Sequence, residues 1–81
     1  MKDQTFGFLV WLYRTYGTTV QATYKEIAKV NGKLCYGTIR LRLLELEKNG
    51  YLTIENQGKW HQVYRLDEGK VKAAIYGERE I

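Results

Sequence analysis

Basic side chains gather in one short segment of this 81-residue chain. Residues 25 to 42 carry five of them against one acid, Glu26, so this segment alone has a net charge of +4. The five are Lys25, Lys29, Lys33, Arg40 and Arg42. Residues 56 to 66 add Lys59 and Arg65 with no acid. Clustered positive charge attracts phosphate groups and releases their counterions on binding, so both segments are candidates for contact with a nucleic acid.

Catalysis would need a different set of side chains. Cys35 and His61 are the one pair suited to nucleophilic chemistry, and no spacing indicates a third group that would orient them. A single cysteine and a single histidine also provide too few ligands for a structural zinc site. We therefore expect no enzyme, no metal and no other cofactor. Cys35 is expected to be a part-buried residue near a helix cap, and the alternative is a redox sensor. His61 is expected to be an exposed loop residue, and the alternative is a pH sensor.

The composition is that of a small globular domain. Apolar residues make up 44% of the chain and charged residues 27%, which are ordinary values for a folded protein. The sequence has no apolar run of about 18 residues and no signal-peptide cleavage pattern. Its single cysteine suits a reducing compartment. We expect one domain over residues 1–81, located in the cytoplasm, without membrane contact and with no small-molecule ligand evident.

Three helices are predicted before residue 50. Residues 5–16 have apolar side chains nearly all round, which is typical of a helix buried on two sides. A capping box over residues 23–26 opens a second helix. Its buried side is expected to be Ile27, Ala28 and Val30. Residues 36–49 form a third helix, whose core face has the spacing i, i+4, i+7. That face consists of Ile39, Leu43 and Leu46.

Strands and a final helix are predicted around these three. Residues 18–22 are short and β-branched, and residues 51–55 and 62–66 flank a glycine-containing loop that is typical of a hairpin. Asp67 is a suitable N-cap for the last helix. The predicted order is helix, strand, helix, helix, strand, strand, helix.

Two helices joined by a tight turn and followed by a hairpin resemble the winged helix-turn-helix domains. Residues 37–52, GTIRLRLLELEKNGYL, are similar to that family's recognition helix and its step into the wing. Residues 64–69, YRLDEG, resemble the exit from the wing, and residues 26–28, EIA, resemble the core of the second helix. The resemblance covers roughly residues 5–69. The sequence departs from the family in a slightly longer turn and in Cys35, which stands where serine is usual.

The resemblance implies a fold and a function. The fold is α+β: a three-helix bundle with a small antiparallel hairpin wing and an added C-terminal helix. The function is binding of double-stranded DNA by a sequence-specific transcription regulator. The recognition helix, about 35–49, would enter the major groove, and the wing, about 55–62, would lie on the adjacent backbone or minor groove. Such stand-alone domains are similar to small regulators of archaea, bacteria and their viruses. The alternative is a winged helix that assembles with proteins or nucleoprotein without reading sequence.

Individual roles follow from this expected docking. Arg40 is the candidate for a base contact, because its planar fork matches guanine N7 and O6. Arg42, Lys33 and Lys29 are expected to hold the phosphate backbone, and the wing tip is expected to enter the adjacent minor groove or rest on its phosphates. The full set expected at the DNA is Lys25, Lys29, Lys33, Tyr36, Thr38, Arg40, Arg42, Gln57, Lys59 and His61. The alternative for each charged residue is an ordinary solvated surface.

Assembly is suggested by apolar residues near both ends of the chain. A core this small gains from a shared interface, so a homodimer is favoured, with two recognition helices about one turn of DNA apart. The residues expected at the interface are Phe8, Trp11, Leu12, Val71 and Ile75. The alternative is that the C-terminal helix folds back on the first helix within one chain.

Overall fold

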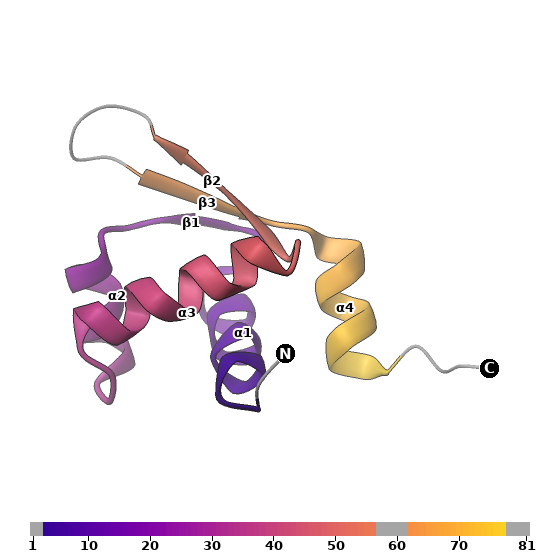
Figure 1. Cartoon of the computed structure of the whole chain (residues 1–81), viewed down its shortest axis with the longest axis horizontal. Coiled ribbons are helices and arrows are strands. Elements are labelled where there is room, and N and C mark those ends of the chain that lie inside the picture. Colours follow the sequence, from indigo (N-terminus) through magenta and orange to yellow (C-terminus); the bar gives the residue numbers. More distant parts are fainter. Residues whose placement is uncertain (1–2, 57–61, 78–81) are drawn as a thin grey trace.

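The computed structural model describes residues 3–56 and 62–77 (Figure 1). Within these ranges the chain has an α+β fold with four helices and three strands. The elements are α1 (Asp3–Tyr16), β1 (Thr19–Gln21), α2 (Tyr24–Asn31), α3 (Tyr36–Lys48), β2 (Leu52–Asn56), β3 (Gln62–Leu66) and α4 (Glu68–Tyr76). The order predicted from the sequence is confirmed, and most bounds differ by a residue or two, where helices fray and strands shorten.

The three strands form one antiparallel sheet in the order β1-β3-β2. In Figure 1 the sheet forms a layer above α1, α2 and α3, while α4 follows β3 at one end of the molecule. Val20 pairs with Tyr64 across β1 and β3, and both side chains are fully buried against the helices. The sheet thus closes the helical layer on one side and leaves the opposite face of α3 open.

Local signals in the sequence fix where α2 begins and ends. Thr23 accepts a hydrogen bond from the Glu26 backbone N–H at 3.1 Å, and the Glu26 carboxylate accepts one from the Thr23 N–H at 2.8 Å. This reciprocal pair is the predicted capping box. Gly32 ends the helix with φ at +77°, a left-handed conformation that favours glycine. A turn of three residues then leads into α3.

The core is formed by one face from each helix together with the inner face of the sheet. The three residues predicted for the core face of α3 are all fully buried, which confirms the rotation of that helix. The residues with no exposed surface are Thr5, Leu9, Leu12, Val20, Ile27, Ile39, Leu43, Leu46, Tyr64 and Val71.

The predicted dimer interface is wrong for three of its five residues. Leu12 and Val71 have no exposed surface within a single chain, and Phe8 is only 4% exposed, so these three present almost no surface to a second copy. Trp11 and Ile75 are partly buried against the same core. The three side chains belong to the core of the single chain, and α4 contacts α1 within it, where the Tyr13 hydroxyl donates to Glu68 at 3.4 Å. The alternative arrangement, a C-terminal helix folded onto the first, is the one found. A homodimer through other residues stays a prediction.

Val30 is a second correction. It was expected on the buried side of α2, yet 58% of its surface is exposed. The short α2 turns Ile27 into the core, while the described elements leave the side that carries Val30 uncovered. The spacing of apolar residues along a helix of two turns does not predict which side of that helix a neighbouring element will cover.

Candidate nucleic-acid interface

The burial of one face of α3 determines which of its side chains face solvent. Ile39 and Leu43 point into the core, and of the three residues between them Arg40 and Leu41 are exposed while Arg42 is half-buried. Leu41 retains 60% of its surface, and Leu44, one turn further along, is half-buried. The outer face of α3 therefore carries apolar as well as basic side chains.

One edge of α3 forms an exposed surface together with α2. The Lys25 ammonium lies 5.9 Å from the centroid of the Tyr36 ring, which is within cation–π range. Tyr36 is 56% exposed, and Arg40 follows it by one helical turn on the same side of α3. Lys29 is exposed one turn after Lys25. We call Lys25, Lys29, Tyr36 and Arg40 the α2–α3 surface.

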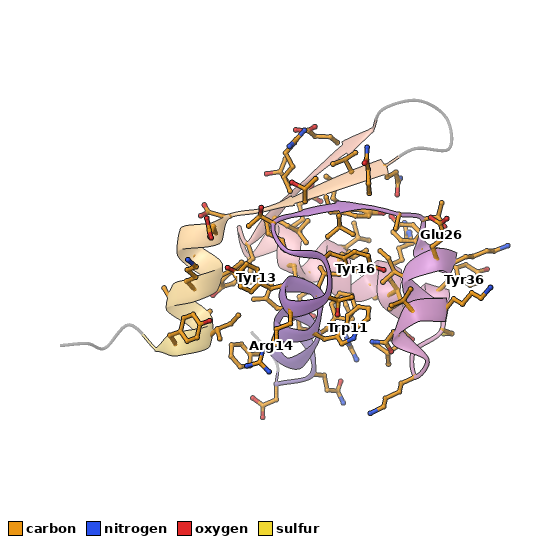
Figure 2. The ribbon with its side chains drawn as sticks, turned by 180° about the vertical axis from the view of Figure 1, so that it is seen from behind. Trp11, Tyr13, Arg14, Tyr16, Glu26 and Tyr36 are labelled. Carbon is orange, nitrogen blue, oxygen red and sulfur yellow. The ribbon has the colours of Figure 1, made fainter. Side chains whose placement is uncertain are left out.

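The acid in the basic segment lies near this surface but is engaged elsewhere. Figure 2 shows Glu26 and Tyr36 at the same end of the molecule, on α2 and at the start of α3. The Glu26 carboxylate accepts the Thr23 N–H at the first turn of α2, where the helix dipole also favours negative charge. Three cations of the α2–α3 surface therefore outnumber the one acid beside them.

Two of the predicted basic residues lie on the opposite edge of α3, toward α1. Arg42 is half-buried and donates to the Gln4 side-chain oxygen at 3.0 Å. Lys33 stands in the turn between α2 and α3, next to α1 residues that include Trp11. The structure therefore divides the predicted DNA-binding set between two edges of one helix. Gln4 was missed in the sequence, because a partner 38 positions away leaves no local pattern.

The first residues of α3 are held differently from those of α2. Cys35 is the N-cap but makes no side-chain capping hydrogen bond, and its sulfur lies 3.4 Å from the Thr38 hydroxyl. Hydrogen bonding with the Thr38 side chain is the main cause that lowers the pKa of the Cys35 thiol. Cys35 is exposed, so the part-buried position expected for it is wrong. Thr38 is half-buried beside it.

The hairpin contributes less free charge than its sequence suggests. Arg65 forms an ion pair with Glu55 at 2.9 Å across β2 and β3. Thr53 is the direct cross-strand neighbour of Arg65, so Glu55 is its diagonal neighbour. The charge count over residues 56–66 did not include Glu55, because this residue lies one position before that segment. Arg65 therefore adds no unpaired positive charge to the sheet.

Three predicted contacts lie outside the described residues: Gln57, Lys59 and His61. The strands that flank them are described, and in Figure 1 these strands extend toward the end of the molecule where α2 lies. The described ends of β2 and β3 are thus on the same side as the α2–α3 surface.

The described residues show neither a metal-binding cluster nor a membrane-spanning helix. Residues 3–56 and 62–77 contain no group of three or more potential metal ligands, and none of their helices is long and apolar enough to cross a bilayer. Comparison of the chain with protein-family models, with curated proteins and with solved structures finds no significant match.

Proposed function

We propose that this protein is a winged helix-turn-helix regulator that binds double-stranded DNA. The element order and the sheet order β1-β3-β2 are compatible with that fold. In such a domain α2, the turn and α3 form the helix-turn-helix, β2 and β3 form the wing, and α4 is an addition. Sequence-specific recognition and a regulatory role in transcription belong to the same proposal, as does a location in the cytoplasm with the DNA.

The observation that carries the proposal is the α2–α3 surface. Arg40 and Tyr36 are exposed one turn apart in the first half of α3, Lys25 on α2 lies over the Tyr36 ring, and Lys29 is exposed one turn after Lys25. A major groove admits one helix, and the first turns of that helix reach the base edges. The flanking lysines then meet phosphates, which position the protein without reading sequence.

Each proposed contact has a distinct chemistry. Arg40 offers its guanidinium fork to guanine, and Leu41 on the adjoining outer face offers apolar contact to a thymine methyl group. The first turn of α3 lacks a side-chain cap, so its backbone N–H groups are free of a capping side chain and suit a phosphate. Lys33 and Arg42, on the other edge, are assigned to backbone phosphates at most.

The test is fluorescence anisotropy of a labelled mixed-sequence duplex, titrated with protein at two salt concentrations. Each phosphate contact contributes a slope of about −0.9 to the plot of log affinity against log salt concentration. We expect Arg40→Ala to weaken binding roughly tenfold. The matched control is Arg14→Ala, which removes the same charge from an exposed position on α1, away from the end of the molecule where Tyr36 lies (Figure 2), and should leave affinity unchanged. Equal effects of the two variants would show a non-specific charge response and contradict the proposed surface.

Cys35 provides a second readout without mutation. It is exposed at the first turn of α3, and its lowered pKa favours the reactive thiolate. A bound duplex should slow its alkylation by a small neutral reagent. An unchanged rate of alkylation at saturating DNA would show that the duplex does not cover the start of α3.

The exposed apolar side chain on α3 favours a second candidate function. Leu41 is 60% exposed on the outer face of the helix, where a protein partner would gain from burying it. A winged helix that assembles with proteins would then keep the fold without reading sequence. Selection from a random duplex library separates the two, because a sequence reader enriches a motif and an assembly module does not.

A further inference from the structure

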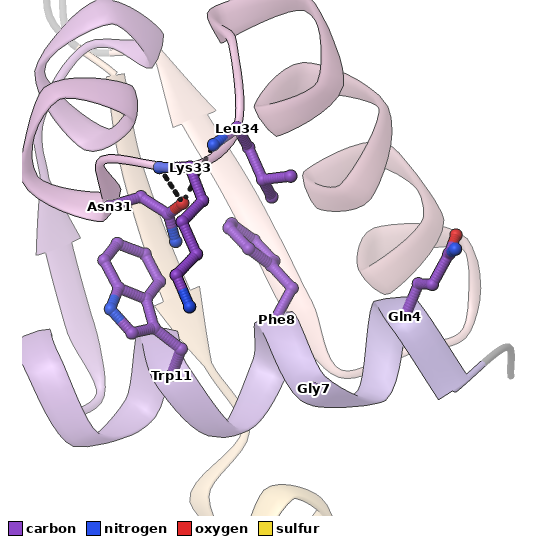
Figure 3. A pocket seen from close by; sticks show the side chains of 7 residues that line it. All are labelled: Gln4, Gly7, Phe8, Trp11, Asn31, Lys33 and Leu34. Carbon is purple, nitrogen blue, oxygen red and sulfur yellow. Dashed lines mark hydrogen bonds between the residues drawn. The ribbon is translucent and has the colours of Figure 1, made fainter.

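A cavity opens between α1 and the turn that joins α2 to α3, on the α1 edge of α3 (Figure 3). Its volume is about 420 Å³. The residues that line it come from α1, from the last residue of α2 and from the turn: Gln4, Gly7, Phe8, Trp11, Asn31, Lys33 and Leu34. None of these residues belongs to the α2–α3 surface, so the cavity is a separate feature of the molecule.

The size of the cavity suits a small organic molecule. Ligand sites are typically about 300–1,000 Å³, and a cavity of about 150 Å³ is enough to hold benzene in another protein. A volume of about 420 Å³ therefore has room for one or two rings and a polar substituent.

One wall of the cavity is aromatic. Trp11 is half-buried, and its ring lies 5.7 Å from the ring of Phe8, which is almost fully buried. Leu34 adds an aliphatic side chain from the turn. Because these side chains are fixed by the core, the wall is formed before any ligand arrives. It presents a rigid apolar surface to a planar body.

The other wall supplies hydrogen-bond donors and a positive charge. Figure 3 shows the Lys33 side chain reaching from the turn toward α1, between Trp11 and Phe8. Asn31 uses its side-chain oxygen to accept the backbone N–H groups of Lys33 and Leu34, both at 3.1 Å, so its amide nitrogen is the group left to donate. No carboxylate is among the lining residues.

Gly7 provides the space for a ligand at the middle of α1. A glycine inside a helix costs stability relative to alanine, and within the described chain no contact requires one here, since an added Cβ would meet no atom within 4 Å. The open space above Gly7 belongs to the cavity. A larger side chain at this position would fill it.

We propose that this cavity binds a small organic anion, a carboxylate joined to one or two aromatic rings. The Lys33 ammonium and the Asn31 amide nitrogen hold the carboxylate, and the rings lie against Trp11, beside the small exposed part of Phe8. The ligand contacts α1 and the turn together. The turn leads directly into α3, so a ligand in the cavity would influence the position of α3 relative to α1. Binding itself is independent of any contact with DNA.

The test is a titration followed by amide and indole NMR shifts, with 1-naphthoate and benzoate as probes and benzylamine as the cationic control. We expect naphthoate to shift the Gly7 amide, the Trp11 indole and the Asn31 side-chain amide, with a dissociation constant on the order of 1 mM. Benzylamine should shift none of them. The protein is titrated without DNA, so failure of DNA binding leaves this result unaffected.

Variants then locate the site. Gly7→Leu fills the cavity and improves helix propensity, so it should abolish binding of naphthoate with the fold intact by circular dichroism. Gly7→Ala adds one methyl group in open space and should retain binding. Lys33→Met keeps most of the stem and removes the charge, and it should weaken naphthoate binding roughly tenfold.

Three outcomes would overturn the proposal. The first is no shift at probe concentrations well above a millimolar. The second is unchanged binding in both Gly7→Leu and Lys33→Met. The third is an equal response to benzylamine, which would show that the cavity does not select a negative charge.

Discussion

Helices α1 and α3 both carry apolar residues outside their core faces, yet the molecule treats these residues in opposite ways. In α1 the second apolar side is covered by the chain itself, with Leu12 fully buried and Trp11 packed against the core. In α3 the core face is equally well buried, but Leu41 on the outer face is 60% exposed. The helix predicted to lie at an interface thus has most of its apolar side chains covered within the chain, and the helix predicted to meet DNA has one that is mostly exposed.

The difference teaches that the hydrophobicity of a helix does not by itself identify an interface. What matters is which of its faces the neighbouring elements cover, since α3 contacts α1, α2 and β2 and still has an uncovered face. α1 contacts α3 on one side and α4 on another, whereas the described elements leave the outer face of α3 uncovered. An apolar side chain becomes evidence for a partner only where the chain leaves it exposed.

The largest expected effect concerns the interior of α1. Leu12→Ala should lower the free energy of unfolding by about 2–5 kcal/mol, because it removes buried methyl groups and leaves a cavity. The measurement is urea denaturation followed by circular dichroism. A loss below about 1 kcal/mol would mean that α1 is not packed as described.

The next effect concerns the hydrogen bond that joins α1 to α3. The hydroxyl of the fully buried Thr5 donates to the Glu45 carboxylate at 2.8 Å. Thr5→Val keeps the shape and removes the donor, so the free energy of unfolding should fall by about 1–2 kcal/mol. Thr15→Val, an exposed change on the same helix, is the control. Equal stability of the two variants would contradict this hydrogen bond.

A smaller effect, with the opposite sign, is expected at the open start of α3. Cys35 occupies the N-cap without a capping hydrogen bond, and serine is a preferred N-cap residue. Cys35→Ser should raise the free energy of unfolding by about 0.5–1 kcal/mol. Cys35→Ala, which cannot cap, should not raise it, and thermal unfolding of the three proteins checks the order.

The smallest effect is expected on the outer face of α3. Leu41→Ala should change the free energy of unfolding by less than about 0.5 kcal/mol, because the side chain is mostly exposed. The same denaturation measurement as for Leu12→Ala provides the contrast. A large loss at Leu41 would mean that the outer face is covered in solution, by a second copy or by a part of the chain outside the described residues.

Local structure was predictable to a large extent. The capping box at Thr23, the end of α2 at Gly32 and the rotation of α3 around Ile39 each depend on neighbours within one or two helical turns. For the candidate site, the sequence predicted which residues are basic and lie on the helix-turn-helix, but not how they are arranged in space. Its division between two edges of α3 depends on Gln4, which lies 38 positions from Arg42 along the chain. The cavity at Gly7 likewise depends on residues of the turn that are distant in sequence.

The sequence by itself determined the elements, their order and which face of each helix is apolar, because hydrophobic periodicity and capping are local properties of the backbone. Only the tertiary structure decided which apolar faces the chain covers and which charges meet. Arg65 has its partner on another strand, and Val71 has its neighbours in the shared core. Burial and ion pairing are properties of elements brought together in space, so no window of sequence contains them.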